Sequence, residues 1–121
     1  MTSVLILLAG LMGAAGVALL AAAAHAAPGA TLDSAGQILL FHAVAVIALA
    51  SVISLPALTS RPLSLIAAFG LIIGASLFAG DIAARAFLGH RLFPMAAPTG
   101  GVIMIASWLA VAVAALIAAV S

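Results

Sequence analysis

The stretch Gly100–Val120, GGVIMIASWLAVAVAALIAAV, contains no charged residue and decides the fold class. A helix that crosses a hydrocarbon core of about 30 Å needs about 20 mostly apolar residues, and this stretch is long enough. The chain could not bury such a helix in water, because 69% of its 121 residues are hydrophobic and only 4% are charged. Soluble proteins have about 25% charged residues, and disordered ones have low hydrophobicity. The composition therefore excludes both classes and indicates an integral membrane protein.

Three further apolar runs have spanning length. We expect helices over residues 4–27, 35–58, 62–88 and 100–120. The first ends at Pro28 and Gly29, and Pro62 suits the first turn of the third. Barrel strands alternate apolar and polar residues, and these runs do not. Because short loops make consecutive helices antiparallel, the sequence predicts one all-α domain over residues 1–121. It is an up-down four-helix bundle in the membrane, with both termini on the same side.

Composition also excludes several functions. The net charge of +1 gives no reason to expect a nucleic-acid partner. The absence of cysteine excludes disulfides, iron–sulfur clusters and thiolate metal sites. The sequence has no glycine-rich phosphate loop and no Ser-His-Asp pattern, and no internal repeat stands out. We therefore expect no enzyme activity, no cofactor and no metal.

The N-terminal run invites a second interpretation as a cleaved leader. Residues 22–27 contain A-x-A patterns that resemble a signal-peptidase site. However, no basic region precedes them, and the apolar run exceeds the usual length of about 7–15 residues. We expect the segment to be retained as a spanning helix.

Small residues mark expected packing faces. Gly70 and Gly74 form a GxxxG motif in the third helix, and Gly10, Gly13 and Gly16 lie in the first. Small side chains let helix backbones approach closely in lipid. We interpret these faces as contacts within the bundle, with docking to a larger complex as the alternative.

The fourth helix has its own packing residues. Trp108 lies within the helix, where we expect it to be a packing anchor. Gly100 and Gly101 follow Pro98 and Thr99, a pattern that predicts a tight turn into this helix.

Ionisable residues gather toward one face of the expected membrane span. These are His25, His42, Asp81, Arg85, His90 and Arg91. On the expected helix bounds, His42 and Asp81 each lie on the order of 10 Å from the same boundary. Charges inside lipid are costly and normally pair. The i,i+4 spacing of Asp81 and Arg85 therefore predicts an ion pair inside the bundle, with His42 close by.

This polar cluster of His25, His42, Asp81 and Arg85 is open to several interpretations. The simplest is a structural ion pair. A proton or ligand site and an anchor for a partner subunit are alternatives. A haem b held by His25 and His42 and a His–Asp metal site have less support, because the two histidines differ in depth. Arg61 on one side against Arg85 and Arg91 on the other leaves the membrane orientation undecided.

Four short motifs, one in each expected helix, occur together in order. They are GVAL at 16–19 leading to Ala24-His25, HAVA at 42–45, LFAGD at 77–81, and APTGG at 97–101 followed by Trp108. Together they resemble the small membrane-protein family known as domain of unknown function 423. That family includes YgdD-like bacterial proteins and animal transmembrane protein 256.

The resemblance implies four transmembrane helices in a bacterial inner membrane or a mitochondrial membrane, and no established activity. The chain departs from the family pattern at two places. The family's Y-Q before the histidine of the second helix is Ile38-Leu39 here, and its S-L-Y in the third helix is Asp81-Ile82-Ala83. Asp81 and Arg85 are therefore candidates for this chain's own polar substitutes.

Two functions remain after these exclusions. The first is a small non-enzymatic accessory subunit of a larger membrane complex, favoured by the minimal loops and small-residue faces. The alternative is an oligomeric transporter or proton-conducting protein that uses the His/Asp/Arg cluster. The expected surroundings are a lipid bilayer, most simply a bacterial inner membrane, and either a larger membrane complex or further copies of this chain.

Overall fold

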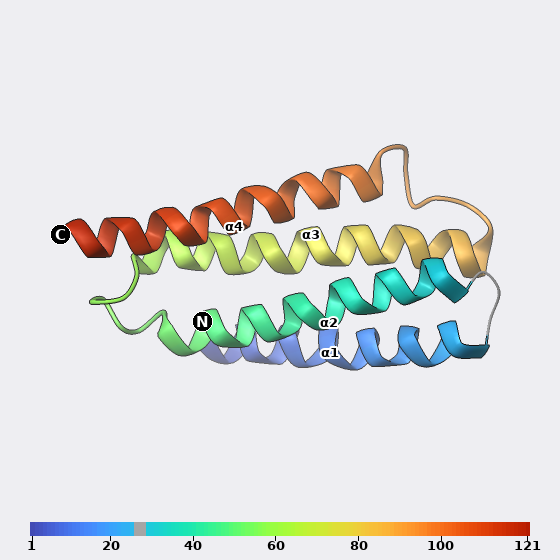
Figure 1. Cartoon of the computed structure of the whole chain (residues 1–121), viewed down its shortest axis with the longest axis horizontal. Coiled ribbons are helices and arrows are strands. Elements are labelled where there is room, and N and C mark those ends of the chain that lie inside the picture. The colour runs from blue at the N-terminus through green and yellow to red at the C-terminus, as the bar shows by residue number, and fades with distance from the viewer. Residues whose placement is uncertain (26–28) are drawn as a thin grey trace.

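The computed structural model describes residues 1–25 and 29–121, which form four long helices and, within those ranges, no strand. They are α1 (Thr2–His25), α2 (Gly29–Val52), α3 (Arg61–Leu88) and α4 (Ala96–Val120). Consecutive helices run antiparallel, and both chain ends lie at the same end of the bundle (Figure 1). All four helices are long and apolar enough to cross a membrane. The prediction of an all-α, up-down bundle is confirmed.

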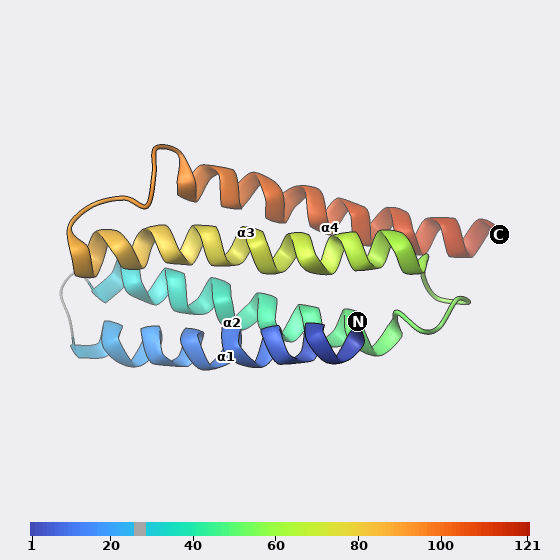
Figure 2. The ribbon, with the colours of Figure 1, turned by 180° about the vertical axis from the view of Figure 1, so that it is seen from behind.

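The bundle consists of two helical hairpins joined through their inner helices. α1 packs against α2, α4 packs against α3, and α2 packs against α3, while α1 also touches α3. The views from both sides show α1 and α4 as the outer helices (Figure 1, Figure 2). Among the four helices, the backbone of α4 approaches only that of α3, and Ala114 O of α4 also accepts a hydrogen bond from the backbone N–H of Ser60, just before α3. Most of the surface of α4 is therefore exposed.

In each hairpin, the two helices cross at a pair of glycines. A Cβ atom placed on Gly16 would lie 2.9 Å from the carbonyl oxygen of Gly36, and one on Gly36 would lie 2.8 Å from that of Gly16. Gly74 and Gly100 repeat the arrangement, at 2.8 and 2.6 Å. Such short distances are open only to residues without a side chain, so glycine permits this close approach. The two hairpins thus share one crossing geometry, which the sequence alone did not suggest.

The glycines of the GxxxG motif lie inside the bundle, whereas Gly10, also expected to pack there, is exposed, and a Cβ atom placed on it would meet nothing within 4 Å. Gly70 faces Ser107, and Gly74 faces Gly100. The alternative that this GxxxG motif docks an outside partner is therefore wrong. Gly100 and Gly101 lie within α4 rather than in a tight turn before it. The reason is that Pro98 falls in the first turn, where a helix needs no amide hydrogen from it.

The largest difference from the expected boundaries concerns α2, which covers residues 29–52 instead of 35–58. Its end follows from Pro56, because a proline ring clashes with the carbonyl group four residues earlier, that of Val52. Near its start, Gln37 Nε2 donates a hydrogen bond to Asp33 Oδ2 at 2.6 Å. Polar residues that resemble a loop thus belong to the helix.

The other boundaries differ less. α3 covers residues 61–88 instead of 62–88, and α4 begins at residue 96 instead of 100. The predicted end of the first helix at Ala27 and Pro28, with the last part of the A-x-A segment, lies outside the described residues. Gly29, expected in the loop, is the first residue of α2.

Candidate functional site

The buried ionisable side chains, His42 and Asp81, lie at two separate levels of the bundle. Gly74 and Gly100 mark a common level on α3 and α4. Asp81 lies seven residues from Gly74 toward one end, and Trp108 lies eight residues from Gly100 toward the other. At 1.5 Å per residue, the two levels are about 22 Å apart. The first level holds Asp81 and Arg85, and the second holds His42 and Trp108.

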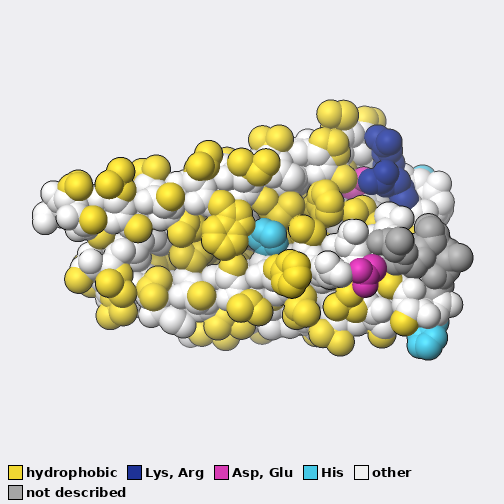
Figure 3. All heavy atoms as spheres, in the orientation of Figure 1, with side chains coloured by type: hydrophobic (Ala, Val, Ile, Leu, Met, Phe, Trp, Pro, Cys, Tyr) yellow, Lys and Arg dark blue, Asp and Glu magenta, His cyan; other side chains and the backbone are white. Residues whose placement is uncertain are grey.

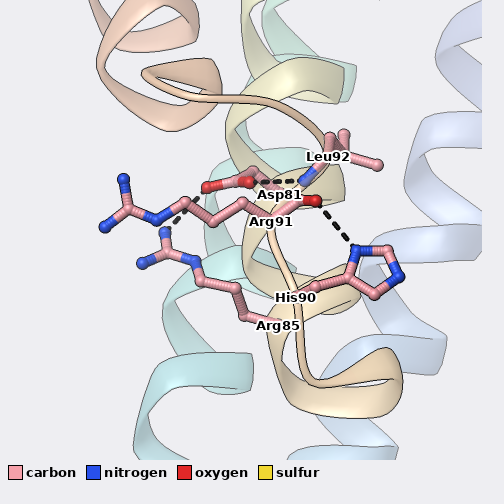
Figure 4. Close-up of polar contacts among 5 residues, drawn as sticks. All are labelled: Asp81, Arg85, His90, Arg91 and Leu92. Atoms are coloured by element: carbon pink, nitrogen blue, oxygen red, sulfur yellow. Dashed lines mark hydrogen bonds and ion pairs between the residues drawn. The ribbon is translucent and has the colours of Figure 1, made fainter.

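Asp81 is the centre of the first level. Its side chain is 2% exposed, and Oδ2 forms an ion pair with Arg85 Nη2 at 2.9 Å. Oδ1 accepts a hydrogen bond from the backbone N–H of Leu92 at 3.0 Å (Figure 4). The predicted i,i+4 ion pair is present. However, the Arg85 side chain is 42% exposed, so the pair lies at the edge of the bundle and not wholly inside it.

The loop that follows α3 explains how Leu92 reaches Asp81. α3 extends 14 residues beyond Gly74, whereas α4 begins only four residues before Gly100. α3 therefore extends about 15 Å beyond the start of α4 along the bundle axis. The loop at 89–95 runs back along this exposed part of α3 (Figure 1). The hydrogen bond from the Leu92 N–H to Asp81 holds the loop against α3, and the ion pair with Arg85 occupies the other oxygen of the carboxylate.

The second level joins the two hairpins through side chains. Trp108 Nε1 donates a hydrogen bond to His42 Nε2 at 3.2 Å, and the two rings meet edge to face with centroids 6.0 Å apart. His42 Nδ1 lies 2.8 Å from the carbonyl oxygen of Ile38, one turn earlier. His42 is buried, at 8% exposure. Both ring nitrogens of this histidine are therefore occupied within the protein.

The structure does not bring His42 to Asp81, so the expectation that it lies close to the ion pair is wrong. The cause is the earlier start of α2, which places His42 13 residues into the helix. Its level lies in the opposite half of the bundle from Asp81. His42 also does not meet His25, which ends α1 and is exposed. The two histidines lie about 23 Å apart along the bundle.

The distance between His25 and His42 decides whether they could bind a haem or a metal ion together. A single haem b cannot take axial ligands from His25 and His42 at such a distance. Among residues 1–25 and 29–121, no three His, Cys, Asp or Glu side chains lie together as a metal site would require. The interior polar groups are thus arranged to satisfy one another.

Charged and hydrophobic side chains divide the surface. On the face shown in Figure 3, the charged side chains gather at the end where the α3–α4 loop lies, and hydrophobic ones cover the rest. Arg61 opens α3 at the other end. Since 20 residues separate Arg61 from Asp81, the two charges lie about 30 Å apart, which equals the thickness of a hydrocarbon core. Asp81 and Arg61 are therefore far enough apart on α3 to lie at opposite boundaries of a membrane.

An apolar groove of about 630 Å³ runs between α1 and α3. Alanine side chains line much of it, and Leu39 of α2 also contributes. Among the described residues that line it, Ser76 has the one polar side chain. The groove can accommodate hydrocarbon, and none of these described side chains could act as an acid, base or strong nucleophile.

Two features of these sites were missed by sequence reasoning. The first is the backbone N–H of Leu92, which no side-chain pattern could reveal. The second is the contact of Trp108 with His42, since Trp108 was expected only to pack. A single tryptophan and a histidine on different apolar helices gave a weak signal, and pairing them required the helix register.

Comparison with known proteins gives one match. Residues 6–101 match the model of the family described as "Protein of unknown function (DUF423)". No curated protein and no solved structure matches the chain. The matched range includes α2, α3 and both polar levels except Trp108. Since the match covers most of the sequence, the chain belongs to the DUF423 family of proteins of unknown function.

Proposed function

We propose that this protein is a non-enzymatic membrane protein that packs, as an accessory subunit, against a larger membrane protein. Four helices of spanning length and short connections support the membrane location. The family resemblance favours a bacterial inner membrane, with both termini on one side. The proposal of a partner rests on the exposed surface of α1.

One stripe of exposed residues on α1, at alternating spacings of three and four, consists largely of small residues. The exposed residues of this stripe are Leu7, Gly10, Ala14, Val17, Ala21 and Ala24. A Cβ atom on Gly10 would meet no neighbouring atom within 4 Å, so the fold itself does not require glycine there. Glycine inside a helix is unfavourable by about 0.5–1 kcal/mol relative to alanine. Small residues on an outer face permit close approach of another helix.

The interior chemistry supports a role without catalysis. Asp81 has a cation and an amide as partners, and His42 has an indole and a carbonyl. Each of these groups is engaged in holding helices or loops together. Transport along a path from His42 to Asp81 has less support, because about 22 Å separates their levels.

Site-directed crosslinking in native membranes tests the proposal. The chain contains no cysteine, so a single one can be introduced without interference. Gly10→Cys and Ala14→Cys, treated with a short bifunctional reagent, should yield an adduct with a larger protein. Leu109→Cys is the matched control, because Leu109 is 64% exposed on α4, which does not pack against α1. No adduct at either α1 position, or the same adduct from Leu109→Cys, would contradict the proposal.

A further inference from the structure

The end of the bundle near the α3–α4 loop carries two arginines on one side. Figure 4 shows the guanidinium groups of Arg85 and Arg91 projecting in the same direction, beyond the carboxylate of Asp81. Figure 3 shows a continuous patch of Lys/Arg atoms at this end. The chain has no lysine, and its third arginine, Arg61, lies at the other end of α3. The patch therefore consists of Arg85 and Arg91.

The carboxylate at this site neutralises only one of the two arginines. Asp81 Oδ2 pairs with Arg85, and Oδ1 is taken by the Leu92 amide. No carboxylate in the described parts of the chain lies within ion-pair distance of Arg91. Asp33, the other acidic side chain, accepts a hydrogen bond from Gln37 on α2. The site therefore keeps a net positive charge, with the N–H donors of Arg91 exposed.

The backbone holds Arg91 in place. The next residue, Leu92, is bonded through its amide to Asp81, and Leu92 Cδ1 would lie 3.4 Å from a Cβ atom on Gly80. His90 Nδ1 lies 2.9 Å from the carbonyl oxygen of Arg91 (Figure 4). The loop is thus fixed on both sides of Arg91. A loop already held in place presents Arg91 to an anion at lower entropic cost than a loop that must first be ordered.

The position of the pair indicates which anion it meets. In a membrane whose core of about 30 Å reaches from Arg61 to Asp81, Asp81 lies at the boundary, and the guanidinium group of Arg85, paired with it at 2.9 Å, lies at the same level. This is the depth of phospholipid headgroups. Exposed hydrophobic side chains lie next to the arginines in the sequence, namely Phe87, Leu88, Leu92 and Phe93, at 45% exposure or more. Such side chains suit contact with acyl chains just below a headgroup.

We propose that Arg85 and Arg91 bind the phosphate group of an anionic phospholipid at the membrane surface. Guanidinium groups match the oxygen geometry of phosphate and can bind it in bidentate fashion. Basic sites at the ends of transmembrane helices are a known mode of recognition for anionic headgroups. Free phosphate offers the same chemistry, and the experiment distinguishes it from lipid.

Native mass spectrometry of the protein in mild detergent measures the bound lipid directly. Phosphatidylglycerol and phosphatidylcholine of identical acyl chains are added in equal amounts. The wild type should retain phosphatidylglycerol in preference. Arg91→Gln should weaken that retention about fivefold, the factor that one arginine near an anionic surface contributes. Arg91→Lys, which keeps the charge without the planar donor pair, should fall between them.

Arg61→Gln is the matched control, because it removes one arginine from the opposite end of the same helix. It should leave phosphatidylglycerol retention unchanged. An equal loss in Arg61→Gln and Arg91→Gln, or no preference over phosphatidylcholine, would overturn the proposal. Displacement of the lipid by excess inorganic phosphate would also overturn it, since the ligand would then be a free anion. Thermal unfolding of Arg91→Gln verifies that the bundle is intact.

Discussion

Trp108 Nε1 donates a hydrogen bond to His42 Nε2 at 3.2 Å, and this contact connects α4 to α2. The indole N–H is only a donor, so Nε2 of His42 must be the acceptor. The histidine is then neutral and carries its proton on Nδ1, which donates to the carbonyl oxygen of Ile38. The backbones of α2 and α4 do not approach each other. This side-chain pair therefore provides a hydrogen bond between the outer helix of the second hairpin and the first hairpin.

The first prediction concerns this pair. Trp108→Phe keeps an aromatic ring but removes the donor, and His42→Phe removes the acceptor. Each change should lower the stability in detergent by about 1 kcal/mol, and the double variant should lose less than the sum. Since Trp108 is the one tryptophan, its fluorescence reports on this site alone, and His42→Phe should shift the emission. Additive losses with an unchanged emission spectrum would argue against the contact.

The helices could be predicted from sequence far better than their register. Four apolar runs specify four spanning helices, because the membrane requires backbone hydrogen bonds to be satisfied within each helix. The i,i+4 pair of Asp81 and Arg85 also follows from sequence, since both residues share one helix. The level of His42 did not follow, because it depends on where α2 begins. Polar residues such as Asp33 are compatible with either a loop or a helix end.

The second prediction separates two adjacent glycines of α4. A Cβ atom on Gly100 would meet the carbonyl oxygen of Gly74 at 2.6 Å, whereas one on Gly101 would meet nothing within 4 Å. Gly100→Ala should therefore force α3 and α4 apart and cost about 1–3 kcal/mol. Gly101→Ala should be neutral or stabilising by up to about 1 kcal/mol, from helix propensity. Thermal unfolding in detergent compares them, and equal effects would contradict the close crossing.

The third prediction concerns the ion pair. Arg85→Ala leaves a buried carboxylate with one hydrogen bond, whereas Asp81→Asn leaves a guanidinium that is 42% exposed to its surroundings. Arg85→Ala should therefore be the more damaging change. Breaking a fully buried pair costs about 3–5 kcal/mol, and solvent screening of Arg85 reduces this to about 1–3 kcal/mol.

The double variant Asp81→Asn/Arg85→Ala provides the control for this pair. It should regain part of the stability lost in Arg85→Ala, since no unpaired carboxylate remains. Denaturation of all three variants in one detergent gives the comparison. If Asp81→Asn proved the most destabilised, Arg85 would have to be buried more deeply than the structure shows.

The fourth prediction concerns the two residues with positive φ in the α3–α4 loop. Gly89 has φ of 75° and ends α3, and Met95 has φ of 67° and precedes α4. A side chain disfavours this region by about 1 kcal/mol. Met95→Gly should therefore stabilise the protein by about 0.5–1 kcal/mol, and Gly89→Ala should destabilise it by a similar amount. Melting temperatures that move in the same direction for both would refute this assignment.

Purification at native expression level is the most direct test of the proposed accessory role. The protein, carrying a small C-terminal tag, is extracted in mild detergent or a lipid nanodisc, and the mass of the intact assembly is measured. We expect a stoichiometric complex with one larger membrane protein, lost when Gly10 and Ala14 on the outer face of α1 are both replaced by leucine, while the four helices still form. A monomer, or an assembly of this chain alone, in every detergent and nanodisc would contradict the proposed function.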